Sequence, residues 1–257
     1  MCETCGCGLP GEEATISRPD VDSGHHEHGE TAAHHHERPH KSGLLQLEQD
    51  VLRKNSLLAE RNRGYFEALG IKVINLMSAP GSGKTSLLEK TLAALKDELP
   101  AGVIEGDQQT LLDAERIMAT GVPVIQVNTG NGCHLDAAMV AKAMKEGAFE
   151  SVKLMFIENV GNLVCPSLFD LGEDHRVVLF SVTEGDDKPL KYPTMFMSAD
   201  VCIISKTDLL PYVDFDIEVA RTNLMQVNHH LKVFELSVKQ EESLMPWIGW
   251  LKGMKSS

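Results

Sequence analysis

The chain has 257 residues, of which 42% are hydrophobic and 24% are charged, so it can form one substantial domain with attachments. Its 24 Lys and Arg residues against 37 Asp and Glu residues give a formal net charge of −13. That charge argues against binding to nucleic acids or to acidic membrane surfaces. The sequence contains no apolar run of the roughly 20 residues that span a bilayer, and its first residues do not form a secretory signal, so we expect a cytoplasmic protein.

Residues 1–43 are expected to be a disordered tail that binds metal, because they have no sustained apolar period. Within them, Cys2, Cys5 and Cys7 and a nearby α-amine suit square-planar Ni²⁺, and tetrahedral Zn²⁺ is also compatible with them. A redox dithiol is the alternative interpretation. Seven of the eleven histidines lie between His25 and His40, as in flexible segments that bind nickel, zinc or copper weakly.

Residues 44–70 are predicted to form an amphipathic helical lead-in that ends at Gly70 and could break near Asn55-Ser56. Its apolar positions recur at helical spacing among charged residues and include Leu44, Leu47, Val51, Leu58, Tyr65 and Leu69.

Residues 71–257 are predicted to form one α/β domain, in which a mostly parallel sheet is flanked by helices on both faces. We expect strands at 71–77, 102–105, 122–127, 153–158, 177–182, 201–205 and 233–236. The intervening helices are expected at 85–99, 110–120, 135–146, 215–228 and 243–252.

A phosphate-binding loop follows the first of these strands. The segment Ser78-Ala79-Pro80-Gly81-Ser82-Gly83-Lys84-Thr85-Ser86 matches the P-loop pattern, except that Ser78 replaces the first glycine. Small residues let successive backbone N–H groups point at phosphate, and the start of a helix adds its positive end. We therefore expect a P-loop NTPase in which Lys84 reaches the β- and γ-phosphates and Thr85 binds Mg²⁺. The nucleotide-contacting set is predicted to be Gly81, Ser82, Gly83, Lys84, Thr85 and Ser86.

Two later segments are expected to face the same nucleotide. Asp107 follows the second strand and Glu158 ends the fourth, so with Lys84 they are the candidate catalytic residues. Asp113 is a weaker candidate near Mg²⁺, and an ordinary solvated helix position is nearly as good an interpretation. Gly161 is placed to offer its N–H to a γ-phosphate.

The base is predicted to be guanine. Ser205-Lys206-Thr207-Asp208 follows a late strand and is close to the Asn-Lys-x-Asp signature of GTP-binding proteins. An ionised Asp208 offers two acceptors to the N1–H and amino groups of guanine, whereas adenine carries an acceptor at N1. Lys206 belongs to the same set, and Ser237-Val238-Lys239 is a weaker candidate for a base contact.

A second metal site is predicted from Cys133, His134 and Cys165. Three ligands are too few for a closed four-coordinate site, but two chains related by a two-fold axis would supply six. A lone buried cysteine is usually a small apolar residue, and that interpretation is favoured for Cys202.

Taken in order, these motifs closely resemble the HypB family of hydrogenase nickel-incorporation GTPases. The resemblance rests on the cysteine and histidine segments, the P-loop, Glu-Gly-Asp at 105–107, Gly-Cys-His-Leu at 132–135, Glu-Asn-Val-Gly-Asn-Leu-Val-Cys-Pro at 158–166 and Lys-Thr-Asp-Leu-Leu-Pro-Tyr at 206–212. Ser205 and the segment Gln240-Glu241-Glu242 depart from the family pattern.

This resemblance implies a GTPase that forms a GTP-dependent or metal-dependent homodimer and helps deliver nickel to the large subunit of [NiFe]-hydrogenase. It also implies a small zinc-containing nickel chaperone and a peptidyl-prolyl isomerase as partners, GTP and Mg²⁺ as cofactors, and Ni²⁺ or Zn²⁺ as the bound metal. A urease-type nickel accessory GTPase and a nickel or zinc storage protein with a vestigial GTPase are the alternatives.

Overall fold

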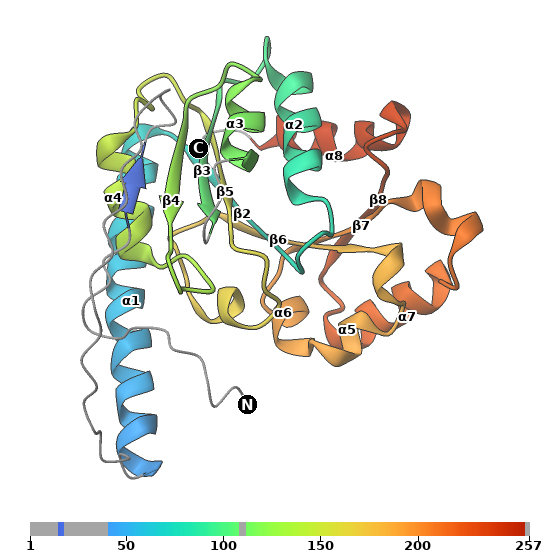
Figure 1. Cartoon of the computed structure of the whole chain (residues 1–257), viewed down its shortest axis with the longest axis horizontal. Coiled ribbons are helices and arrows are strands. Elements are labelled where there is room, and N and C mark those ends of the chain that lie inside the picture. The colour runs from blue at the N-terminus through green and yellow to red at the C-terminus, as the bar shows by residue number, and fades with distance from the viewer. Residues whose placement is uncertain (1–14, 18–40, 108–111, 255–257) are drawn as a thin grey trace, which may run out of the picture.

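The computed structural model describes residues 15–17, 41–107 and 112–254, which form a central sheet covered by helices on both faces (Figure 1). The strand order is β1-β4-β3-β5-β2-β6-β7-β8. The strands from β2 to β8 run parallel to their neighbours, and β1 pairs antiparallel with β4. The strands are β1 (Thr15–Ser17), β2 (Lys72–Ser78), β3 (Ala101–Asp107), β4 (Val124–Asn128), β5 (Leu154–Glu158), β6 (His175–Ser181), β7 (Val201–Ser205) and β8 (Lys232–Glu235). The predicted mostly parallel α/β fold is confirmed.

The helices follow the strands in alternation over most of the chain. They are α1 (Lys41–Leu69), α2 (Lys84–Leu95), α3 (Leu112–Met118), α4 (Ala137–Glu146), α5 (Lys188–Lys191), α6 (Pro193–Met197), α7 (Ile217–Val227) and α8 (Glu241–Gly253). Short 3₁₀ turns lie at Cys165–Leu168, Val182–Glu184 and Thr207–Tyr212. None of the described helices is both long and apolar enough to cross a membrane.

The two faces of the sheet have separate cores, because successive residues of a strand point to opposite faces. On one face, Ile74 and Leu76 of β2 join a core with α2, α3 and α8 that includes Trp247. On the other face, Val73 joins a core with α1 and α4 that includes Phe66. Figure 1 shows α1 and α4 together beside β4, with α2 and α3 on the other face. Consecutive residues at a strand end can therefore serve sites on opposite faces.

The N-terminal segment differs in part from its prediction. Thr15–Ser17 forms β1 within the tail expected to be disordered, because pairing with the edge strand β4 supplies backbone hydrogen bonds that the tail lacks by itself. The helix α1 begins at Lys41 and is unbroken at Asn55, whose side chain bonds to distant backbone groups instead of competing for its own helix. The predicted ligands Cys2, Cys5 and Cys7 and the histidine-rich segment lie outside the described residues.

Other boundaries shift by a few residues, and two helices were not predicted. The helix predicted over 85–99 ends at Leu95, and the strand predicted from 177 begins at His175. The short helices α5 and α6 each carry proline in the first turn. Segments of four or five residues are too short to show a helical period, so the sequence pattern gave no sign of them.

Candidate nucleotide and metal sites

The P-loop lies between β2 and α2, as predicted. Gly81 and Gly83 have φ angles of 74° and 101°, which side chains rarely adopt, so these glycines let the chain turn into the helix. The Lys84 ammonium donates to Ser78 Oγ at 2.9 Å. Ser78, which replaces the usual first glycine of the P-loop, therefore orients the lysine. The free N–H groups at the start of α2 and this ammonium form an anion-binding concavity.

An open cleft of about 480 Å³ gathers most of the predicted nucleotide residues from the ends of β2, β3, β5 and β7. The side chains lining it include Lys84, Thr85, Ser86, Asp107, Asp113, Glu158 and Lys206, together with Gly81, Gly83 and Gly161. Ser82 instead turns toward Glu184, whose Oε1 accepts its hydroxyl at 2.6 Å. Gly161 abuts the P-loop so closely that a Cβ there would lie 3.1 Å from Pro80 Cα.

The carboxyl side chains beside Thr85 fit a divalent cation. Thr85 Oγ1 donates to Glu158 Oε1 at 2.7 Å. The buried oxygens Glu158 Oε2 and Glu105 Oε2 have no hydrogen-bond partner among the described residues. Burial raises the pKa of Glu158 to about 6, although Lys84 and Thr85 oppose the shift, and burial followed by the charge of Glu158 raises the pKa of Glu105 to about 9. A hydroxyl and orphaned carboxyl oxygens are the ligand types that Mg²⁺ uses.

A smaller pocket of about 200 Å³ adjoins the P-loop and has the chemistry of a guanine site. Lys206, Asp208, Val238 and Lys239 line it. Asp208 Oδ1 accepts from Ser237 Oγ, and the Lys239 ammonium lies 3.5 Å from Oδ2, so the pKa of Asp208 is lowered and its carboxyl group stays ionised. The weaker predicted segment 237–239 therefore does meet Asp208.

Strand β7 is tied to the P-loop at the start of this pocket. Ser205, where asparagine is usual, donates to the Ser82 carbonyl at 2.7 Å. Lys206 has a left-handed backbone with φ 59° and donates to the Gly81 carbonyl at 2.7 Å. Such a conformation is costly for a residue with a side chain and is typical of functional positions. Although Ser205 replaces the usual asparagine, it still links the segment 205–208 to the P-loop through a hydrogen bond.

Two residues of the nucleotide cleft region were missed by the sequence analysis. Arg116 of α3 lies in the cleft and donates to Ser86 Oγ at 3.1 Å and to Asp113 Oδ1 at 3.1 Å. Glu184 fixes the P-loop by accepting the hydrogen bond from the Ser82 hydroxyl. No local motif marks either residue, since Arg116 is one of several charged residues on α3 and Glu184 is 102 residues from its partner.

Cys133, His134 and Cys165 converge as predicted. Their ligand atoms all lie within 4.8 Å of one another, and Cys133 Sγ is 3.7 Å from His134 Nδ1. Burial lowers the pKa of His134 although Asp136 opposes it, which favours the neutral imidazole that binds metal. The ring of Phe169, which the sequence analysis did not single out, stacks on His134 with centroids 3.9 Å apart. Cys202 is fully buried in β7, as expected for a core residue.

The nucleotide cleft and the cysteine–histidine cluster meet at the end of β5. Glu158 faces Thr85, while the next residue, Asn159, faces the opposite side of the sheet. Asn159 Oδ1 accepts from the backbone N–H of Leu135 at 3.0 Å, and its amide donates to Asn75 Oδ1 at 3.3 Å. Leu135 directly follows His134, so one buried side chain connects the two sites.

Comparison with known proteins identifies relatives over most of the chain. Residues 72–235 match the family model "CobW/HypB/UreG, nucleotide-binding domain". The chain is 50% identical over 245 residues to Hydrogenase maturation factor HypB of Escherichia coli (strain K12), covering 95% of this chain and 84% of that protein. It is 46% identical over 204 residues to Hydrogenase/urease maturation factor HypB of Helicobacter hepaticus, covering 78% of this chain and 84% of the relative. The crystal structure of HypB from Helicobacter pylori in complex with nickel superposes with a TM-score of 0.74 at 44% identity, over 77% of this chain and 93% of that one.

Proposed function

The chain belongs to the HypB family of hydrogenase maturation factors, and we propose that it is a GTPase that binds nickel and assists its insertion into the large subunit of [NiFe]-hydrogenase. The observation that carries the proposal is the close connection of two sites. Asn159, which follows Glu158, accepts a hydrogen bond from the backbone N–H of Leu135, the residue next to His134 of the cysteine–histidine cluster. A nucleotide site alone would have no need of the cluster, and a metal store would have no need of the P-loop.

Each residue of the nucleotide site has a chemical role in this proposal. The P-loop N–H groups and Lys84 hold the phosphates, and Asp208 accepts hydrogen bonds from guanine. Thr85, Glu158 and Asp107 would hold Mg²⁺, which would supply positive charge beside the phosphates. Gly161 would contact the γ-phosphate, so that loss of this phosphate releases its loop.

Cys133, His134 and Cys165 would bind nickel or zinc as cargo. Thiolate and imidazole ligands suit both metals, and the three ligands of one chain would be completed by a second copy in a GTP-dependent or metal-dependent homodimer. The exposed side chains of Val164 and Leu168, 53% and 50% accessible, flank Cys165 and would be covered in such a dimer. Cys2, Cys5 and Cys7 would form a separate site in the tail.

The proposed setting is the cytoplasm, with a small zinc-containing nickel chaperone, a peptidyl-prolyl isomerase and the hydrogenase large subunit as partners. Urease maturation is a second candidate, because the relative from Helicobacter hepaticus is named for hydrogenase and urease together. The two uses are distinguished by assaying both enzymes for nickel content in cells that lack this chain.

The test of the GTPase is turnover with and without Mg²⁺ in wild type and Lys84→Ala. We expect slow, Mg²⁺-dependent hydrolysis that falls by about 100-fold or more in the variant, because an ammonium aimed at the phosphates is lost. Lys90→Ala is the matched control, since Lys90 is exposed on the same helix. Unchanged hydrolysis in Lys84→Ala would contradict the assignment of the phosphate site.

A further inference from the structure

Helix α1 carries two buried asparagines that the nucleotide cleft does not use. Asn55 and Asn62 are 6% and 5% exposed, on a helix that was predicted to be amphipathic. Burying an amide is unfavourable unless its hydrogen bonds are made. The hydrogen-bond partners of these amides therefore show which segments of the chain are fixed to the helix.

Both asparagines join the same two segments of the chain. Asn55 Oδ1 accepts from Ala137 N at 2.9 Å, and its amide donates to the Asp170 carbonyl at 2.7 Å. Asn62 donates to the Ala137 carbonyl at 2.8 Å and to the Leu171 carbonyl at 3.1 Å. Each side chain thus bridges the start of α4 to the segment at 170–171.

These two segments carry the metal ligands. Ala137 lies three residues after His134, and Asp170 lies five residues after Cys165. The two segments also touch each other, because Phe169, which immediately precedes Asp170, stacks on the His134 ring. Both halves of the cluster are therefore attached to one rigid helix within a few residues of their ligands.

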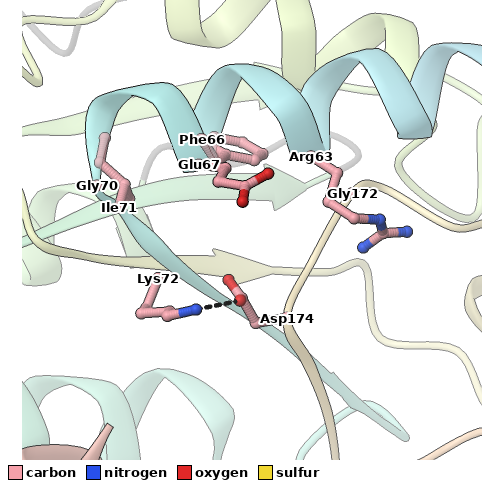
Figure 2. A pocket seen from close by; sticks show the side chains of 8 residues that line it. All are labelled: Arg63, Phe66, Glu67, Gly70, Ile71, Lys72, Gly172 and Asp174. Atoms are coloured by element: carbon pink, nitrogen blue, oxygen red, sulfur yellow. Dashed lines mark hydrogen bonds and ion pairs between the residues drawn. The ribbon is translucent and has the colours of Figure 1, made fainter. Parts of the chain in front are cut away.

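The helix and the second segment are in direct backbone contact. Gly172 has φ 91°, and a Cβ there would lie 2.7 Å from the Ala59 carbonyl oxygen and 2.8 Å from Arg63 N, so only glycine fits. Arg63 adds hydrogen bonds to Asp170 Oδ2 and to the Glu173 carbonyl, each at 2.7 Å. Figure 2 shows Arg63 extending from α1 along the segment that carries Gly172.

We propose that Asn55 and Asn62 are positioning residues for the Cys133–His134–Cys165 metal site, and that α1 sets the separation at which its three ligands converge. The inference rests on the proposed metal-binding function. The ligands come from segments about 30 residues apart, and metal–ligand distances tolerate only about 0.2 Å. Outer partners that fix ligands in this way are worth about 10–100-fold in metal affinity.

The test uses the full-length chain with Cys2→Ala, Cys5→Ala and Cys7→Ala, so that the nickel signal comes from the cluster. Nickel affinity and the thiolate-to-nickel charge-transfer absorption are measured in Asn55→Ala, Asn62→Ala and the conservative Asn55→Asp. Asn55→Asp keeps the acceptor for Ala137 but loses the donor to Asp170. GDP affinity and thermal unfolding are measured on the same proteins.

Two controls separate positioning from general stability. Ser56→Ala removes an exposed hydroxyl next to Asn55, and Asn223→Ala removes a buried amide on α7 that bonds the Asp186 carbonyl. We expect the three α1 variants to bind nickel about 10–100-fold more weakly with an altered absorption band and unchanged GDP affinity. The controls should keep the wild-type band.

Wild-type nickel affinity and absorption in the α1 variants would overturn the inference, and α1 would then serve only to cover its face of the sheet. Weaker nickel binding that is always accompanied by weaker GDP binding, and that Asn223→Ala also shows, would overturn the inference, because it would indicate general destabilisation. If nickel binding in the background chain is insensitive to Cys133→Ala, the proposed metal site itself fails, and this result is distinguishable from the other two.

Discussion

Replacing Asn159 by alanine is expected to uncouple the metal cluster from the nucleotide. Asn159 follows Glu158 and is 1% exposed, and its side chain holds the loop of His134 through Leu135 N. A nucleotide-dependent movement of Glu158 or of the Gly161 loop would therefore be transmitted to the ligands through this amide. By reciprocity, metal would change GTP affinity by the same factor as GTP changes metal affinity.

The size of the effect follows from the hydrogen bonds that the variant loses. Truncation leaves the N–H groups of Leu135 and Val160 and the Oδ1 of Asn75 without their Asn159 partner, and each buried group left unsatisfied costs about 1–3 kcal/mol. The free energy of unfolding should fall by about 3 kcal/mol, which a chain of this size tolerates. Allosteric coupling is usually worth about 1–3 kcal/mol, or about 5–150-fold in affinity, so losing it is measurable.

The assay is the dissociation constant of Ni²⁺ or Zn²⁺ with GDP and with a non-hydrolysable GTP analogue. In wild type the two constants should differ, Cys133→Ala should remove the site, and Asn159→Ala should bring their ratio close to one. Asn223→Ala is the control for loss of a buried amide and should keep the wild-type ratio. Equal constants in wild type would defeat the coupling, and an undiminished ratio in Asn159→Ala would refute the route through this side chain.

Asp208→Asn should lower GTP affinity by about 100-fold and improve binding of xanthosine triphosphate, because the new amide donates where the carboxylate accepted. The measurement is competition binding, and an unchanged GTP affinity would contradict the base assignment. In nucleotide-free protein, the folded pKa of Glu105, about 9, exceeds its ordinary 4.5. Its contribution to stability is therefore complete below pH 4.5 and declines by at most about 1.4 kcal/mol per pH unit up to pH 9. Urea unfolding of Glu105→Gln across that range should show a flatter profile, and an identical slope would be the opposite result. Cys2→Ala should remove only the tail site, so loss of all metal binding in a titration would argue for a single shared site.

The sequence predicted the P-loop turn between β2 and α2 because the geometry of this turn is local. The turn from β2 into α2 depends on glycines at 81 and 83, and the groups proposed to bind phosphate are consecutive in the chain. Lys206 and Asp208 were predicted to share a site for the same reason, since they follow one strand, and both line one pocket beside the P-loop. The alternation of apolar segments likewise predicted the parallel sheet, because a strand buried on both faces must be apolar throughout.

The sequence also named the members of the cysteine–histidine cluster, but only the tertiary structure brought them together. Cys165 is 31 residues from His134, and no spacing rule predicts that their ligand atoms lie within 4.8 Å. Phe169 carried no signal, because a single aromatic residue in a loop resembles any other.

The connections between sites were decided by tertiary structure alone. Asn55 was expected only as a break in the amphipathic helix, and Asn62 was not singled out at all. The partners of both side chains lie 75 to 115 residues away. Asn159 belonged to a recognisable motif, yet its direction toward Leu135 follows from the strand alternation and from the packing of α4 on β4. Local motifs specify chemistry because neighbouring residues share one backbone path. Long-range hydrogen bonds leave no periodic trace in the sequence, so folding alone determines which sites they join.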